Sequence, residues 1–204
     1  LQLFAHQYTA NAAYRSFCQR RGATVRNARS WSDLPAVPID AFKAMELRCA
    51  PPAPTDRIFM TSGTTGGAVR GQNIHPSLDV YDLSMLRNFA QRFMQGAARM
   101  PMGILFPDEV AMPHSSLAHY LALAKSGFGS EDSRCFVSPQ GMDFEGLWQF
   151  LAAAERSGEP CALLGASFSF VHAIDALRQE GRAFSLPQGS RLLDTGGYKG
   201  QSRE

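Results

Sequence analysis

The sequence lacks the features that mark membrane, secreted and nucleic-acid-binding proteins. Its apolar runs, such as Cys161 to Gly165, are far shorter than the roughly 20 residues that cross a bilayer. No charged-then-apolar signal segment opens the chain, the longest basic block is the pair Arg20-Arg21, and the net charge is only +2. These absences predict a soluble, cytoplasmic protein with neither a nucleic acid nor a membrane as its partner.

Cysteine pairs with metal-ligand spacing are also missing. Cys18, Cys49, Cys135 and Cys161 are dispersed, with no CxxC pair and no histidine close by. Separate thiols are typical of a reducing compartment, and we interpret each one as a small hydrophobe rather than as a ligand. The sequence therefore predicts no metal-binding side chains.

The hydrophobic pattern divides the chain at about residue 55. Apolar residues recur at helical spacing over 4–21, which predicts an opening helix, and prolines break 30–55 into turns around a short helix at 41–47. We interpret 1–55 as this helix followed by a proline-rich wrapping arm. We expect 56–204 to be an α/β nucleotide-binding subdomain that is truncated at its C-terminal end, because the chain begins without methionine and stops just after a glycine turn.

Beyond residue 55, short apolar runs alternate with longer helical patterns. The runs predict strands at 58–61, 102–106, 135–137, 161–164 and 191–194, and the patterns between them predict helices at 76–100, 115–125, 144–156 and 168–180. This order predicts an α/β fold with a mostly parallel sheet covered by helices on both faces. Ligands of such sheets bind outside the carboxyl ends of the strands. We therefore expect the turns at 61–67, 165–168 and 195–199 to meet there.

The most distinctive segment is RIFMTSGTTGG at 57–67, a short apolar run that ends in hydroxyls and glycines. Glycine backbone can approach a ligand closely, so that successive N–H groups converge on an anion. The segment has neither the Lys-Ser/Thr end of a Walker loop nor the GxGxxG spacing of a dinucleotide fold. We predict phosphate binding by Thr61, Ser62, Gly63, Thr64, Thr65, Gly66 and Gly67.

The wording TSGTTG resembles the signature loop of the adenylate-forming (ANL) superfamily, which includes acyl-CoA synthetases, peptide-synthetase adenylation domains and luciferases. VPIDAFKAMEL at 37–47, RMPMGILFPD at 99–108 and RLLDTGGYKG at 191–200 are similar to the acyl-protein synthetase (LuxE-type) branch. That branch activates fatty acids for bacterial bioluminescence and has relatives that activate other acids. The resemblance runs from about Pro35 to the last residue and implies the N-terminal part of an adenylate-forming enzyme fold.

The resemblance implies a ligase that activates a carboxylic acid, with a fatty acid implied by the branch alone. The acid and ATP form an acyl-adenylate and pyrophosphate with the help of Mg²⁺, and the acyl group then passes to a thiol of an acyl-acceptor protein or coenzyme A. Such chemistry depends on positioning and electrostatic stabilisation rather than on a covalent nucleophile. Thr64 and Thr65 are the hydroxyls expected to act on the phosphates during catalysis.

The same resemblance assigns roles near the end of the chain. Gly196, Gly197 and Tyr198 would contact adenine, with Tyr198 either stacking on the base or capping the sheet edge. Ser167 and Phe168 would border the acyl pocket. The segment GASFS at 165–169 departs from a GxSxG nucleophile elbow at its fifth position, so we do not favour a serine hydrolase.

His114 is a further candidate, because its imidazole would orient the carboxylate of the acid substrate and take part in catalysis. Ser115 fits equally well as the N-cap of the helix that follows, with His119 on the surface of that helix. Family loops commonly continue to a lysine where this chain has Arg70. Arg70 either takes over that cationic role or simply faces solvent.

Two other functions stay open at this point. Adenylate-forming enzymes are considerably longer, and their ribose-binding acid and mobile lysine lie beyond the end of this sequence, so the fragment alone is expected to be inactive. The alternative is a non-catalytic nucleotide- or acyl-binding module, which acid-dependent turnover would separate from a ligase. A phosphatase or kinase would release or transfer phosphate without an added acid.

Overall fold

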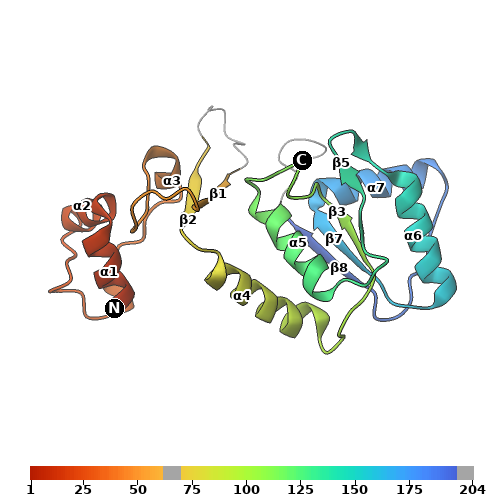
Figure 1. Cartoon of the computed structure of the whole chain (residues 1–204), viewed down its shortest axis with the longest axis horizontal. Coiled ribbons are helices and arrows are strands. Elements are labelled where there is room, and N and C mark those ends of the chain that lie inside the picture. The colour runs from red at the N-terminus through yellow and green to blue at the C-terminus, as the bar shows by residue number, and fades with distance from the viewer. Residues whose placement is uncertain (62–69, 197–204) are drawn as a thin grey trace. The chain divides into compact units, whose positions relative to one another are not determined.

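The computed structural model describes residues 1–61 and 70–196 (Figure 1). It divides into two compact units, Leu1–Leu78 and Asp79–Glu204. The predicted boundary between 1–55 and 56–204 placed the hairpin at 57–75 with the α/β part, whereas the structure groups that hairpin with the N-terminal unit. Each unit is described by itself.

The first unit opens with two helices, α1 (Gln2–Ala10) and α2 (Ala12–Arg20), where one continuous helix was expected. The break falls at Asn11, whose backbone is extended (φ −110°, ψ 103°). Its side-chain oxygen accepts a hydrogen bond from Tyr14 N at 2.9 Å and so caps α2. The side-chain cap at Asn11 thus divides the segment into two helices, although the apolar periodicity continues through both.

A small core holds the first unit together. Phe4 of α1 and Cys18 of α2 are buried with Ala23 and Ala28, and four partly buried side chains, Tyr8, Tyr14, Phe17 and Leu34, pack against them. The proline-rich stretch contains a 3₁₀ turn, η1 (Trp31–Asp33), and the short helix α3 (Ala41–Ala44). Turns around one short helix were predicted, although that helix ends three residues earlier than expected.

The hairpin of the first unit overturns one predicted strand pairing. β1 (Arg57–Met60) pairs antiparallel with β2 (Gln72–His75), with Ile58 opposite Ile74. We expected residues 58–61 to be a strand of the parallel sheet, and this is wrong. Because β2 was not recognised in the sequence, the local antiparallel partner was overlooked.

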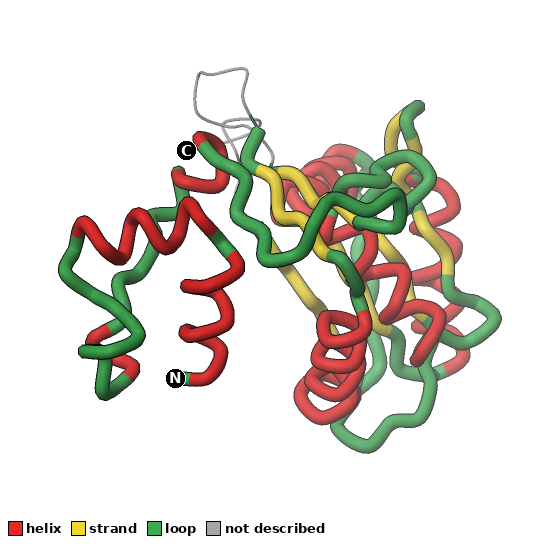
Figure 2. Tube along the Cα trace, turned by 60° about the vertical axis from the view of Figure 1, so that its left-hand side comes forward, coloured by secondary structure: helices red, strands yellow, loops and turns green. Residues whose placement is uncertain are grey.

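The second unit is an α/β structure around a parallel sheet of four strands in the order β4–β3–β7–β8 (Figure 2). These strands are β3 (Met102–Leu105), β4 (Arg134–Cys135), β7 (Ala162–Ala166) and β8 (Arg191–Thr195). A two-stranded hairpin follows β4, made of β5 (Val137–Ser138) and β6 (Gly141–Met142). Predicted apolar runs cover most of β3, β7 and β8. The predicted run at 135–137 shares only Cys135 with β4, and its last residue, Val137, begins β5 instead.

Helices connect these strands at or near the predicted positions. They are α4 (Asp79–Asn88), which continues as the π-helical turn η2 (Phe89–Met94), α5 (Ser116–Phe128), α6 (Phe144–Ser157) and α7 (Ser167–Gln179). The predicted helix at 76–100 is shortened at both ends. Its C-terminal limit is Gln95, which adopts a left-handed conformation (φ 46°).

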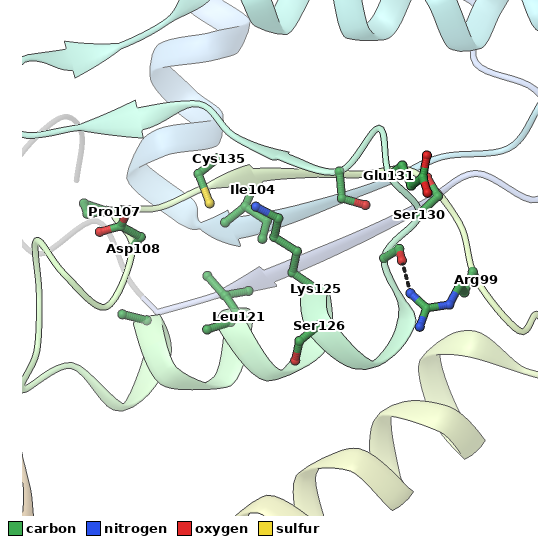
Figure 3. Close-up of a pocket in the computed structure, with 14 residues that line it drawn as sticks. Arg99, Ile104, Pro107, Asp108, Leu121, Lys125, Ser126, Ser130, Glu131 and Cys135 are labelled. Atoms are coloured by element: carbon green, nitrogen blue, oxygen red, sulfur yellow. Dashed lines mark hydrogen bonds between the residues drawn. The ribbon is translucent and has the colours of Figure 1, made fainter.

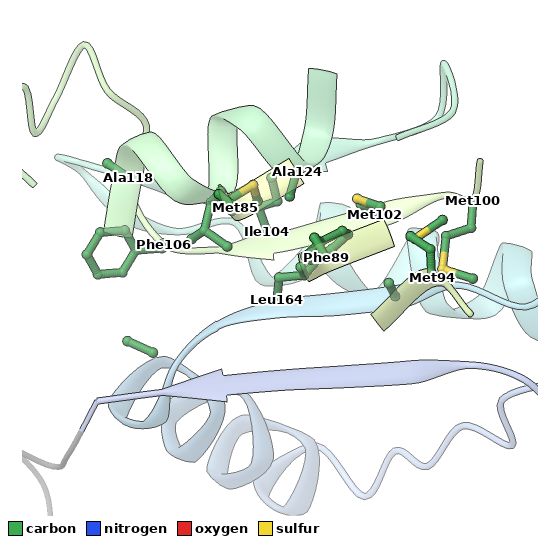
Figure 4. Close-up of a cluster of buried hydrophobic side chains, with 13 residues drawn as sticks. Met85, Phe89, Met94, Met100, Met102, Ile104, Phe106, Ala118, Ala124 and Leu164 are labelled. Carbon is green, nitrogen blue, oxygen red and sulfur yellow. The ribbon is translucent and has the colours of Figure 1, made fainter. Parts of the chain in front are cut away.

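Alternate residues of the strands belong to two different apolar clusters. Met102 and Ile104 of β3 belong to the first cluster, with side chains of α4, η2 and α5 (Figure 4). Leu105 belongs to the second, with side chains of α6 and α7. Successive strand residues point to opposite faces, so the clusters lie on different sides of β3. Among the described residues, no helix is long and apolar enough to cross a membrane.

Candidate functional site

The carboxyl ends of β3, β7 and β8 lie at one edge of the parallel sheet (Figure 1). In the register, Ala166 of β7 is opposite Thr195 of β8, so the residues that follow each strand are neighbours. This edge is where open α/β sheets bind ligands. We expected the turns at 61–67, 165–168 and 195–199 to meet here. The described residues of the last two do, whereas the first follows β1, which belongs to the other unit and not to this sheet.

Ser167 joins these two turns. Its hydroxyl oxygen lies 2.8 Å from Asp194 Oδ1 and 2.8 Å from the carbonyl oxygen of Gly196. The hydroxyl has one proton to donate, so the two acceptors share it. Ser167 is the first residue of α7 and only 7% exposed. It therefore fixes the beginning of α7 to the chain that leaves β8.

Gly196 has the backbone freedom that its position requires. Its φ is +94°, and a Cβ built on it would meet no atom of residues 1–61 and 70–196 within 4 Å. A side chain at this φ would be strained, and Gly196 is exposed. Gly197 and Tyr198, the other predicted adenine contacts, lie outside the described residues.

A cavity of about 450 Å³ lies beside this edge, a size within the usual range for small-molecule sites. Its lining residues come from α4, α5 and β8: Tyr81, Ser116, Leu117, Tyr120, Leu193, Asp194 and Thr195. Burial raises the pKa of both phenols, Tyr81 and Tyr120, which keeps them uncharged and able to donate hydrogen bonds. Sequence reasoning missed these tyrosines, because helical packing brings them to the strand.

His114 lies in the loop between β3 and α5 and is exposed. The structure confirms the capping role of its neighbour: Ser115 Oγ accepts a hydrogen bond from Ala118 N at 3.2 Å. At the start of the loop, Asp108 Oδ1 accepts from Ala111 N at 2.9 Å. The loop is thus ordered at both ends, and the role of His114 toward a substrate stays a prediction.

His119 is not on the helix surface, as we expected, but is 9% exposed. Its Nδ1 lies 2.7 Å from Glu109 Oε1, and its Nε2 lies 2.8 Å from Asp82 Oδ1. A neutral imidazole donates through one ring nitrogen and accepts through the other, whereas a protonated ring donates through both. His119 ties the β3–α5 loop to α4. No local pattern indicates this contact, since the partners of His119 are 10 and 37 residues away in the chain.

Phe168 is partly buried and packs against the first apolar cluster, as Leu193 does. Its ring lies edge-on to His172, with centroids 6.5 Å apart. These contacts place Phe168 in the packing at the start of α7. Its expected position beside an acyl group stays a prediction.

Thr61 lies in the hairpin of the first unit. Its Oγ1 accepts a hydrogen bond from Gly71 N at 3.0 Å, and its own N–H donates to the carbonyl of Gly71 at 2.9 Å. These bonds close the base of the segment between β1 and β2. The other predicted phosphate contacts, Ser62 to Gly67, lie outside the described residues, and Arg70 is exposed.

The comparisons with known proteins agree with the resemblance of the signature segments. A profile of the family described as "Acyl-protein synthetase, LuxE" matches residues 1–204. No curated protein shows a significant match to the chain. Because the family profile covers the whole sequence, the chain belongs to the LuxE acyl-protein synthetase family.

Proposed function

We propose that this chain carries the nucleotide- and acid-binding part of an ATP-dependent acyl-protein synthetase, built on the N-terminal part of an adenylate-forming fold. The observation that carries the proposal is the joined turn of Ser167, Asp194 and Gly196 beside the 450 Å³ cavity. It combines an exposed backbone, a fixed carboxylate and an open cavity at the edge where such sheets bind ligands. Family membership supports an acyl-protein synthetase in general.

The proposed reaction has two steps. A carboxylate oxygen of the acid attacks the α-phosphorus of ATP, and the bond from that phosphorus to the oxygen bridging to the β-phosphorus breaks, so that pyrophosphate leaves. A thiolate of an acceptor protein or coenzyme A then attacks the acyl carbonyl, and AMP leaves. The first step moves negative charge from one oxygen to another, and the second moves it from the thiolate sulfur to a phosphate oxygen of AMP. A protein accelerates both steps mainly by positioning and by donating hydrogen bonds.

The described residues are better suited to contact the adenine base of ATP and the carboxylic acid substrate than to hold a metal ion. Gly196 leaves room for a planar ring beside β8, and the Asp194 carboxylate, fixed by Ser167, accepts hydrogen bonds from an exocyclic amine. Leu117, Leu193 and the uncharged phenol of Tyr120 offer the acid an apolar wall. A fatty acyl chain would suit this wall.

Mg²⁺ is proposed to enter with the phosphates of ATP, whose charge it would partly neutralise. Within residues 1–61 and 70–196 no group of three His, Cys, Asp or Glu side chains is arranged to hold a metal, so no protein-held metal takes part in the proposal. Thr61, together with the segment that follows it, would donate hydroxyl and N–H groups to the β- and γ-phosphates. A hydroxyl whose oxygen accepts one hydrogen bond still has a proton to donate, and Thr61 Oγ1 accepts from Gly71 N.

His114 is proposed to orient the carboxylate of the acid. Its loop is held by the Ser115 cap at one end and by the Glu109–His119 contact near the other. An imidazole on a fixed loop can donate one hydrogen bond to an incoming carboxylate. Substitution of His114 by Ala would then raise KM for the acid more than KM for ATP.

A pair of glycine substitutions tests the nucleotide part of the proposal. Gly196→Ala places a Cβ at the proposed base contact, and Gly141→Ala is a matched control, because its φ is also positive (+123°) and also faces open space. We expect about tenfold weaker ATP binding for Gly196→Ala, equal to about 1.4 kcal/mol, and unchanged binding for Gly141→Ala. Calorimetry on the natural chain that contains this sequence measures both. Equal affinities in the two variants would remove Gly196 from the nucleotide site.

In the alternative function, the chain is a non-catalytic nucleotide- or acyl-binding module. Such a module would make the same contacts with its ligand but would catalyse no reaction. It predicts ATP binding that responds to Gly196→Ala but no acid-dependent formation of pyrophosphate. Turnover with an added acid, measured on the same preparation, decides between the two.

A further inference from the structure

A second and larger cavity lies on the other side of α5 from the candidate site. Its volume is about 570 Å³, and it opens between α5 and the strands β3 and β4 (Figure 3). It shares no lining residue with the cavity beside β8. The reaction proposed above therefore does not account for it.

The inner wall of this cavity is apolar. Ile104 of β3 and Ala118 and Leu121 of α5 line it, and each of these side chains is at most 2% exposed in the folded chain. An apolar surface of this kind favours the hydrocarbon part of a ligand over water.

Lys125 supplies a positive charge above this wall. Its side chain extends from α5 into the cavity, and its ammonium lies near Ile104 and Cys135 (Figure 3). Across residues 1–61 and 70–196, the structure gives this ammonium no hydrogen bond and no ion pair. The other cation of the cavity is engaged, because Arg99 donates to the carbonyl of Gly129 at 2.5 Å.

Among the described residues, the acidic groups of the cavity form no ion pair with Lys125. Asp108 is hydrogen-bonded to the backbone of its own loop, through Ala111 N, and Glu131 is exposed at the opposite end (Figure 3). Burial raises the pKa of the Cys135 thiol and Asp108 adds to this rise, whereas Lys125 opposes it. The thiol is therefore uncharged near neutral pH and offers Lys125 no anion.

Ser130 provides a second group that lacks a partner. Its hydroxyl oxygen is buried, lines the cavity and makes no hydrogen bond within the described part of the chain. Figure 3 places Ser130 and the Lys125 ammonium at different ends of the cavity. A buried hydroxyl without a partner costs free energy unless a ligand or water satisfies it.

From these features we propose that the cavity is a binding site for a small organic acid with an extended apolar body. The carboxylate pairs with Lys125, the body lies on Ile104 and Leu121, and a polar group at the far end of the ligand reaches Ser130. The site is separate from the proposed reaction centre, and the inference does not rest on the proposed function. An acid bound here would act as an effector of the chain rather than as its reacting substrate.

Alkylation of Cys135 reports occupancy of this cavity directly. Cys135 lines the cavity and is exposed, while the half-buried Cys49 belongs to the other unit and serves as an internal control. The probe is 8-hydroxyoctanoate, and the rate of labelling of each cysteine by iodoacetamide is followed by peptide mass spectrometry. At a probe concentration of about ten times Kd, labelling of Cys135 should slow about tenfold, with Cys49 unaffected.

The contributions of the probe's carboxylate charge and of its hydroxyl group to binding are tested separately. The methyl ester of the probe should protect Cys135 at least tenfold less well, and octanoate, which lacks the hydroxyl, should protect less well than the probe. Lys125→Met should abolish protection, with Lys125→Gln as a second variant if the first does not fold. Arg87→Gln, which removes an exposed charge of α4 in the same unit, should retain it. Each variant is compared with itself in the absence of probe.

Two outcomes would overturn the proposal. If the labelling rate of Cys135 stays unchanged at the highest soluble concentration of the probe, the cavity does not bind the acid. Equal protection in Lys125→Met and in the unsubstituted chain would show that no carboxylate pairs with Lys125.

Discussion

The contact of His119 with two carboxylates gives a prediction whose size follows from the geometry. His119→Ala removes hydrogen bonds of 2.7 Å to Glu109 and 2.8 Å to Asp82. Hydrogen bonds to charged groups contribute about 1.5–3 kcal/mol when buried. Because the two carboxylate side chains are 33% and 32% exposed, water recovers part of this, which leaves about 1 kcal/mol for each bond.

Loss of packing adds to this cost, since the imidazole ring lies 5.8 Å from the ring of Tyr81. We expect the free energy of unfolding of the second unit to fall by about 2–3 kcal/mol in total. The two carboxylates would also lose the ring that lies between them. Each of these losses lowers the free energy of unfolding.

Urea unfolding followed by tryptophan fluorescence measures this loss in the second unit alone. Trp148 is 2% exposed within that unit, and a Trp31→Phe background removes the other tryptophan, which belongs to the first unit. His172→Ala is the matched control, because His172 is exposed on α7 and its substitution should change the free energy by less than about 0.5 kcal/mol. A loss below about 0.5 kcal/mol for His119→Ala would refute the reasoning.

Two further predictions concern other contacts. Gly165→Ala should destabilise the second unit by about 3 kcal/mol, because its Cβ would lie 2.6 Å from the carbonyl oxygen of Leu105; an unchanged urea midpoint would contradict this close approach. In the first unit, hydrogen bonds from Ala53 N and Arg48 lower the pKa of Asp56 from its ordinary 3.8. The carboxylate of Asp56 therefore contributes fully to stability above pH 3.8, and this contribution is lost as the pH falls through the lowered pKa. Thermal unfolding of Asp56→Asn should therefore depend less on acid pH than that of the unsubstituted chain, and identical pH profiles would exclude this role.

The elements predicted best are those with signals within their own segment. For α6, the sequence predicted 144–156, and the helix spans Phe144–Ser157. Asp143 caps its first turn by accepting from Gly146 N at 2.9 Å, and Gly158 ends it in a left-handed conformation (φ 70°). Caps and periodicity agree here, so the boundaries follow from the sequence.

The failures involve contacts that the local sequence does not encode. The apolar pattern of 58–61 fits a parallel or an antiparallel strand equally well, and only the pairing of Ile58 with Ile74 decides. His119 looks like a surface residue of α5 until α4 and the β3–α5 loop bring Asp82 and Glu109 to it. Strand order is also decided by tertiary contacts.

The candidate site was predictable in part for the same reason. The rule that ligands bind at the carboxyl ends of parallel strands brought together the turns at 165–168 and 195–199, which Ser167 links in the structure. The cavity beside them was not predictable, because Tyr81 and Tyr120 reach it from two helices whose packing the sequence pattern does not specify.

The central claim is that the chain takes part in activating a carboxylic acid with ATP. Exchange of labelled pyrophosphate into ATP tests it most directly, run with short, aromatic and long-chain acids on this chain and on the longest natural chain that contains it. The account predicts exchange that requires an added acid and that falls in Gly196→Ala but not in Gly141→Ala. The absence of acid-dependent exchange from both chains with every acid would contradict it.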